Sequence, residues 1–142
     1  MGTRSSIAIE NADGTVTGIY VHWDGYLSHN GRILQENYTT EAAVRELIAL
    51  GDLSSLNKNP NPPVGAEHTF VNSYPDVCVA YGRDRGESNV EAQTLCSRRA
   101  FFRAYEQEYN YLFVDGKWLV STGGEYQEYQ TLAEMTADEE ND

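Results

Sequence analysis

The chain has 142 residues, enough for one domain with a real hydrophobic core, and no apolar run long enough to cross a membrane. Its net charge is −12, and residues 104–142 hold ten acids against the single base Lys117. This charge argues against a basic nucleic-acid-binding domain and suits solubility, a basic protein partner or mimicry of nucleic acid. Cys78 and Cys96 make no disulfide framework, so we expect a reduced cytoplasmic setting. We expect no signal peptide, because Met1–Ser6 is polar and no apolar region follows it.

Two strands are predicted first, over residues 5–11 and 15–22, where apolar and polar residues alternate. Ala12-Asp13-Gly14 between them predicts a three-residue turn with its glycine in the left-handed conformation. A two-residue turn would divide the aliphatic residues between two faces, whereas a three-residue turn gathers them on one. The four residues expected on this buried face are Ile7, Ile9, Ile19 and Val21.

A helix is predicted to begin at Thr40, a favourable N-cap residue, and to end near Gly51. The prolines and asparagines of Asn57–Gly65 indicate a mobile loop. The apolar run Val77–Tyr81 then predicts a buried strand, and the glycine-flanked Gly82–Gly86 predicts a charged turn.

Ser97 is predicted to cap a helix over residues 98–107. Its inward residues are expected to be Phe101, Ala104 and Tyr105. Asp115-Gly116, between alternating apolar residues, predicts a hairpin of residues 109–114 with residues 117–122.

Together these elements predict an α+β fold: an antiparallel sheet of about five strands with two or three helices packed mainly on one face. We expect a single domain over residues 1–136. Residues 137–142 include four acids and predict a disordered tail, because like charges repel and offer nothing to bury.

The first candidate site is Tyr20–Gly31, which holds two of the three histidines and one of the two tryptophans. Its candidate catalytic residues are His22, Asp24 and His29, and its candidate ligand-binding residues are Trp23 and Tyr26. A neutral histidine can act as a base or metal ligand, with the aspartate as its orienter or a second ligand. The alternative is an exposed strand end followed by a turn, since no third ligand and no catalytic signature can be identified.

The second candidate site is a group of four arginines: Arg83 and Arg85 on the charged turn, and Arg98 and Arg99 at a helix start. Two cations in a first helical turn oppose the helix dipole, and an anion such as a nucleotide phosphate would resolve that conflict. The alternative is that the protein's own acids, Asp84 among them, pair with these arginines. The excess of acids favours this second interpretation.

Five tyrosines accompany the acids near the C-terminus and would either bind a basic partner or cover the core. They are Tyr105, Tyr109, Tyr111, Tyr126 and Tyr129. The unrelated spacings of the histidines and cysteines indicate no zinc site, and no phosphate-binding glycine motif occurs. We therefore expect neither a metal nor a cofactor.

Four segments resemble a family of small bacteriophage and prophage proteins: Met1–Ser5 (MGTRS), His22–Tyr26 (HWDGY), His29–Gly31 (HNG) and Tyr81–Glu87 (YGRDRGE). The resemblance runs over most of the chain and implies a phage accessory protein in the bacterial cytoplasm. It implies no particular chemistry. Small acidic phage proteins of this class often inhibit a host defence factor or enzyme.

The sequence thus favours a non-catalytic protein that binds a host protein with a basic surface. One alternative is nucleotide or phosphate binding through the four arginines. Another is metal-assisted hydrolysis centred on His22 and Asp24. Neither membrane attachment nor direct nucleic-acid binding is expected.

Overall fold

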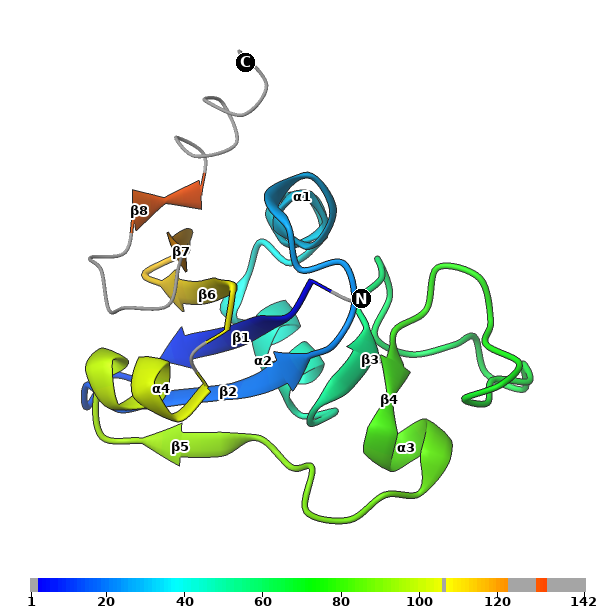
Figure 1. Ribbon diagram of the computed structural model, residues 1–142. Helices are drawn as coiled ribbons and strands as arrows, with labels where there is room; N and C mark the ends of the chain where they lie inside the picture. The colour runs from blue at the N-terminus through cyan, green and yellow to red at the C-terminus, as the bar shows by residue number, and fades with distance from the viewer. Residues whose placement is uncertain (1–2, 106, 123–129, 133–142) are drawn as a thin grey trace.

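The computed structural model describes residues 3–105, 107–122 and 130–132 (Figure 1). Its centre is a sheet with the strand order β4-β3-β2-β1-β6-β7-β8, in which β5 also pairs with β2. The strands are β1 (Ser5–Glu10), β2 (Val16–Val21), β3 (Leu53–Ser55), β4 (Val79–Ala80), β5 (Gln93–Leu95), β6 (Tyr109–Val114), β7 (Lys117–Thr122) and β8 (Gln130–Thr131). Within the described ranges, no helix has the length and apolar character needed to cross a membrane.

The α+β class is as predicted, but the sheet is larger than five strands and it is mixed. β1 pairs with β6 in parallel, and β2 pairs with β3 in parallel, while the other pairs are antiparallel. β2 and β3 are parallel because a helical crossover joins them. β1 and β6 are the adjacent strands of two separate hairpins, the first and the last, and they run in the same direction. β3, β4, β5 and β8 have only two or three residues each, too few for an alternating pattern to reveal.

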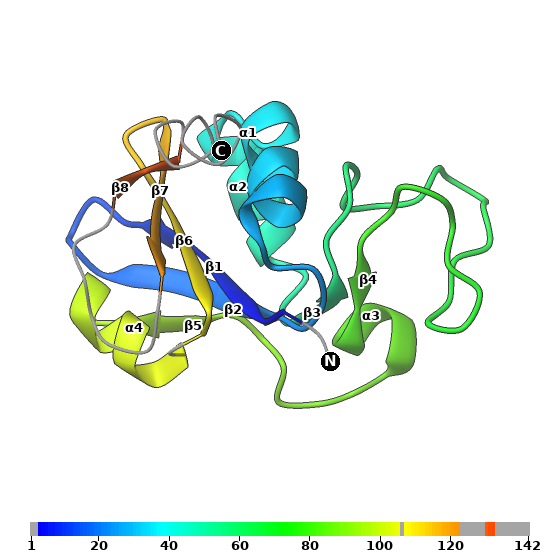
Figure 2. The ribbon, with the colours of Figure 1, turned by 45° about the horizontal axis from the view of Figure 1, so that its top comes forward.

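Helices cover both faces of the sheet (Figure 2). The crossover helices α1 (Arg32–Asn37) and α2 (Glu41–Ile48) lie over one face and complete the main core with Leu34, Val44 and Leu47. Helix α4 (Arg98–Tyr105) lies on the opposite face, where Phe101 packs in a second cluster. The expectation that the helices pack mainly on one face therefore has an exception in α4.

The first hairpin has the predicted register. Glu10 pairs with Val16, and Gly14 takes a φ of +87° in the turn between them. The four aliphatic residues of the predicted buried face all belong to the main core: Ile7, Ile9, Ile19 and Val21. Thr40 caps α2 as predicted, its hydroxyl accepting a hydrogen bond from the Ala43 N–H at 3.2 Å.

The second hairpin is also confirmed, with Val114 opposite Lys117 and both turn residues at positive φ. Ser97 caps α4, accepting from the Ala100 N–H at 3.1 Å, but within that helix Phe102 is buried and Ala104 exposed. Helix α4 contacts β2 and β5, and Phe101 and Tyr105 pack in the cluster on that face of the sheet.

One further expectation needs correction. Gly82–Gly86 is not a simple turn: Tyr81–Arg85 forms helix α3, and Gly86 ends it in the left-handed conformation with φ +76°. The predicted tail, residues 137–142, lies outside the described residues, as do Tyr126 and Tyr129.

Candidate binding site

Residues 22–31, which we call the aromatic junction, connect the end of β2 to α1. Three strands hold the backbone of this segment. The His22 and Trp23 N–H groups donate to carbonyl groups of β3, at 3.1 and 3.0 Å. The Gly25 N–H donates to the Thr3 carbonyl at 2.7 Å, and the Tyr111 hydroxyl of β6 donates to the Gly25 carbonyl at 2.6 Å.

Two residues of the junction have unusual requirements. Asp24 has a φ of +56°, a conformation that a non-glycine residue rarely adopts and that is enriched at functional sites. A Cβ atom on Gly25 would lie 2.7 Å from the Ser5 Cβ and 2.8 Å from the Thr3 carbonyl oxygen, so only glycine allows this close approach to β1. Leu27–Gly31 then forms a π-helical turn, a rare form that often occurs at functional sites.

The buried side chain of Asn30 joins the two ends of the junction. Its amide donates to the Ser5 hydroxyl at 3.3 Å and to the Trp23 carbonyl at 3.4 Å, and its carbonyl oxygen lies 2.8 Å from His29 Nδ1. These bonds and those from the three strands fix the junction backbone. Asn30 was not singled out from the sequence, although it lies in the HNG segment quoted there.

The fixed backbone presents aromatic rings to solvent. Trp23 is 43% exposed and Tyr26 is 37% exposed, while Trp118 is buried. The His22 ring packs edge-on against the Trp23 ring, with ring centroids 4.6 Å apart. The ring centroids of Tyr26 and His29 are 5.9 Å apart. Large aromatic side chains held in this way lose little conformational entropy when a partner covers them.

The two candidate catalytic histidines contact different side chains. His22 Nδ1 lies 2.8 Å from the hydroxyl of Tyr20, whose pKa is raised by burial, and His29 Nδ1 contacts Asn30. Within the described residues neither histidine is hydrogen-bonded to Asp24, and no three His, Cys, Asp or Glu side chains gather into a metal-binding group. In the described residues these side chains are therefore not joined into a hydrogen-bonded acid and base.

Tyr111→Phe tests how the junction is held. We expect the free energy of unfolding to fall by about 1–3 kcal/mol, because the buried Gly25 carbonyl would lose its partner. Urea unfolding measures this effect. Tyr26→Phe is the control and should change the free energy of unfolding by less than about 0.5 kcal/mol, since it is exposed. Equal stability of the two variants would contradict this account.

The four arginines do not form one cluster. Arg83 and Arg85 lie on α3, and Arg98 and Arg99 begin α4, at separate places in both views of the fold (Figures 1 and 2). Arg98 is paired with Glu10 of β1, with Nε to Oε2 at 2.5 Å. Arg85 lies over the Phe70 ring, 4.9 Å from its centroid. The sequence interpretation in which the arginines pair within the protein holds for Arg98.

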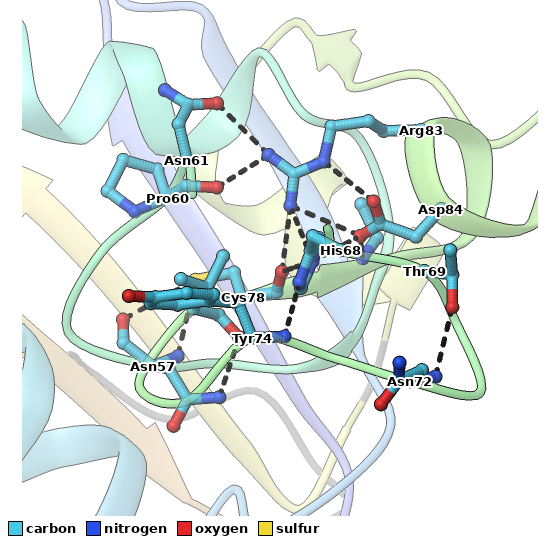
Figure 3. Close-up of polar contacts among 12 residues, drawn as sticks. Asn57, Pro60, Asn61, His68, Thr69, Asn72, Tyr74, Cys78, Arg83 and Asp84 are labelled. Carbon is cyan, nitrogen blue, oxygen red and sulfur yellow. Dashed lines mark hydrogen bonds and ion pairs between the residues drawn. The ribbon is translucent and has the colours of Figure 1, made fainter. Parts of the chain in front are cut away.

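Arg83 is held even more fully, in a cluster with Asp84 and His68 that we call the Arg83 cluster (Figure 3). Its Nε donates to Asp84 Oδ1 at 2.9 Å, and its two terminal nitrogens donate to carbonyl oxygens of Pro60 and Cys78, at 2.6 and 2.8 Å. The Asp84 carboxylate, not a bound anion, therefore satisfies this guanidinium.

The other two side chains of the cluster are 2% exposed. His68 Nδ1 accepts from the Tyr74 N–H at 2.8 Å, so the ring proton is on Nε2, which faces the Cys78 carbonyl at 3.0 Å and Asp84 Oδ2 at 3.1 Å. Burial opposes ionisation of Asp84, but hydrogen bonds from Arg83 and the Ala80 N–H outweigh it and lower the pKa of its carboxyl. No buried side-chain nitrogen or oxygen of the described residues lacks a hydrogen-bond partner.

The role of His68 could not be read from the sequence, because two of its partners, Cys78 and Asp84, lie ten and sixteen residues further along the chain. The cluster also changes the interpretation of the loop before β4. Residues 57–65 were expected to be mobile, yet Pro60 and Asn61 accept hydrogen bonds from Arg83, which ties them to α3.

A shallow depression of about 390 Å³ lies elsewhere, beside the turns of the two hairpins. Its lining includes three acids, of which Glu10 is paired with Arg98 and Glu41 with Arg45. It therefore adds no catalytic arrangement to those described above.

No family model, curated protein or solved structure matches this chain. The resemblance to phage proteins remains a prediction, and the function is argued below from the residues themselves.

Proposed function

We propose that the protein acts by non-catalytic binding to a basic surface of a host protein, with Trp23 and Tyr26 as its main contact residues. The observation that carries this proposal is the exposure of two large aromatic rings on a backbone fixed by three strands and by the buried Asn30. Tryptophan and tyrosine are the residues most enriched among those that dominate binding energy at protein interfaces.

The net charge of −12 supports the choice of a basic partner, because opposite charges accelerate association and exclude acidic competitors. The resemblance to phage proteins supports a bacterial host factor as that partner, and inhibition of a defence factor as the consequence of binding. Binding of this kind needs none of the four arginines, two of which already pair with acids of the protein itself.

The test begins with the full chain immobilised and exposed to bacterial extract, beside the variant Trp23→Ala. A protein retained by the wild type is then purified and titrated calorimetrically. We expect Trp23→Ala to weaken binding at least about tenfold, because a contact residue of this kind is worth more than 1.4 kcal/mol. The melting temperature should fall only slightly, because Trp23 is 43% exposed and the variant loses its contact with the His22 ring.

Arg103→Ala is the matched control, an exposed substitution on α4 on the opposite side of the sheet. Because it removes a positive charge, it should bind the basic partner no more weakly than the wild type does. A partner that binds Trp23→Ala with wild-type affinity would exclude the aromatic junction as its contact surface. If the wild type retains no protein that binds it after purification, the proposed function is wrong.

A further inference from the structure

The loop of residues 57–77, which we call the proline loop, carries the most exposed apolar side chains among the described residues. Val64 is fully exposed, Val71 is 94% exposed and Tyr74 is 39% exposed. The loop projects from the β3–β4 end of the sheet (Figures 1 and 2). Single exposed apolar residues are ordinary, so the inference depends on how this loop is held.

The proline loop is fastened at its base, at Asn61 and at His68. The Asn59 N–H donates to the Asp76 carbonyl at 3.0 Å and the Asn59 carbonyl accepts from the Cys78 N–H at 2.9 Å, which closes the base of the loop. The Asn61 amide donates to Glu46 of α2 at 2.8 Å. His68 fixes the centre, since its buried ring contacts Tyr74, Cys78 and Asp84 (Figure 3).

Prolines at positions 60, 62, 63 and 75 restrict the same backbone further. Much of the entropy cost of ordering a loop on binding is therefore met before any partner arrives. Valine adds to this effect, because its branched side chain has few rotamers to lose. The Arg83 cluster, in which the Asp84 and His68 side chains are buried, thus helps to hold the loop that carries the exposed valines.

The base of the proline loop lies near the aromatic junction. The Trp23 N–H donates to the Ser54 carbonyl of β3, which ends at Ser55, two residues before the loop begins. The end of β2 and the loop lie toward the same side of the molecule in both views (Figures 1 and 2). The loop also carries Glu67 and Asp76 against Lys58, so its charge has the sign that suits a basic partner.

We propose that the proline loop is a second contact surface for the same basic host protein, with Val64 and Val71 inserting into apolar pockets beside the site that receives Trp23. The proposal rests on the proposed function in assuming that protein partner. It adds a distinct requirement, which is that the pockets accept short branched side chains.

The test is calorimetric titration of the purified partner with the full-length variant Val64→Ser/Val71→Ser. We expect at least about tenfold weaker binding, with an unchanged melting temperature because both valines are exposed. Ser73→Ala, another exposed substitution in the same loop, is the matched control and should bind within about twofold of wild type.

The outcomes separate the two proposals. A partner that loses affinity for Trp23→Ala but binds the double valine variant normally overturns the role of the proline loop and leaves the proposed function standing. Absence of any protein that binds the wild type overturns both. Sedimentation of the wild type alone tests whether the loop binds a second copy of this chain. Self-association that the double valine variant abolishes would show that a second copy, not a host protein, covers the loop.

Discussion

Asp84→Asn should lower the free energy of unfolding by about 2–3 kcal/mol at pH 7, because the buried carboxylate accepts hydrogen bonds from Arg83 and from the Ala80 N–H. The amide keeps the shape of the carboxylate but leaves the Arg83 guanidinium without its counter-charge. It also turns an N–H₂ group toward N–H donors of Arg83 and His68. In the wild type these donors form hydrogen bonds to the carboxylate oxygens. Urea unfolding measures the difference.

The pH dependence of this difference has a definite sign. The pKa of the Asp84 carboxyl is lowered in the folded protein, so ionised Asp84 favours the folded state above the unfolded pKa, which is about 4. That contribution is lost as the pH falls through the lower, folded pKa. The gap between wild type and Asp84→Asn should therefore hold from pH 7 to about 4 and narrow below it.

Glu41→Gln is the control for this experiment. It breaks an ion pair with Arg45 in which both side chains are well exposed, and such pairs contribute about 0–1 kcal/mol. A cost for Asp84→Asn no larger than that of Glu41→Gln would show that the Arg83 cluster does not hold α3 and the proline loop together.

The two hairpins could be predicted because their information is local. A turn of known length fixes the register of its strands, and alternation then decides which residues are buried, as for Ile7 and Ile19. The caps at Thr40 and Ser97 are local in the same sense, since each side chain bonds to the residue three positions later. The parallel pairs are not local, and nothing near Leu53 specifies that it lies opposite Val21.

The candidate site was predictable in part for the same reason. Trp23 and Tyr26 were recognised because aromatic residues are dense at the end of β2. Their support was not recognised, because it comes from Ser5 and Tyr111 on distant strands. The four arginines show the opposite problem, because they were grouped by residue type although they are not close in space. Arg83 and Arg98 lie on different helices and pair with different acids.

Among packing changes, we expect a substitution at Gly18 to have the largest effect on stability. The sequence could not predict this, because a glycine within a strand does not indicate what packs against it. A Cβ atom at this position would lie 2.5 Å from the Phe101 ring, 2.6 Å from the Ile7 carbonyl oxygen and 2.7 Å from the Ala8 Cβ. Helix α4 can approach the sheet only because this place on β2 is bare. The Tyr105 hydroxyl, on the same helix, reaches the Gly18 carbonyl at 3.5 Å.

We therefore expect Gly18→Ala to lower the free energy of unfolding by about 3 kcal/mol, at the upper end of the cost of overpacking, since one of the atoms that must move is backbone. Urea unfolding of the single variant measures this cost, and a change below about 0.5 kcal/mol would show that α4 is not seated on β2 in this way. The double variant Gly18→Ala/Phe101→Leu identifies the cause. Leucine is shorter than the ring that the new methyl group meets, so the double variant should be more stable than the sum of the single costs predicts, by at least about 0.5 kcal/mol. Strictly additive costs would instead assign the strain to the Ile7 carbonyl of β1, which the leucine substitution does not relieve.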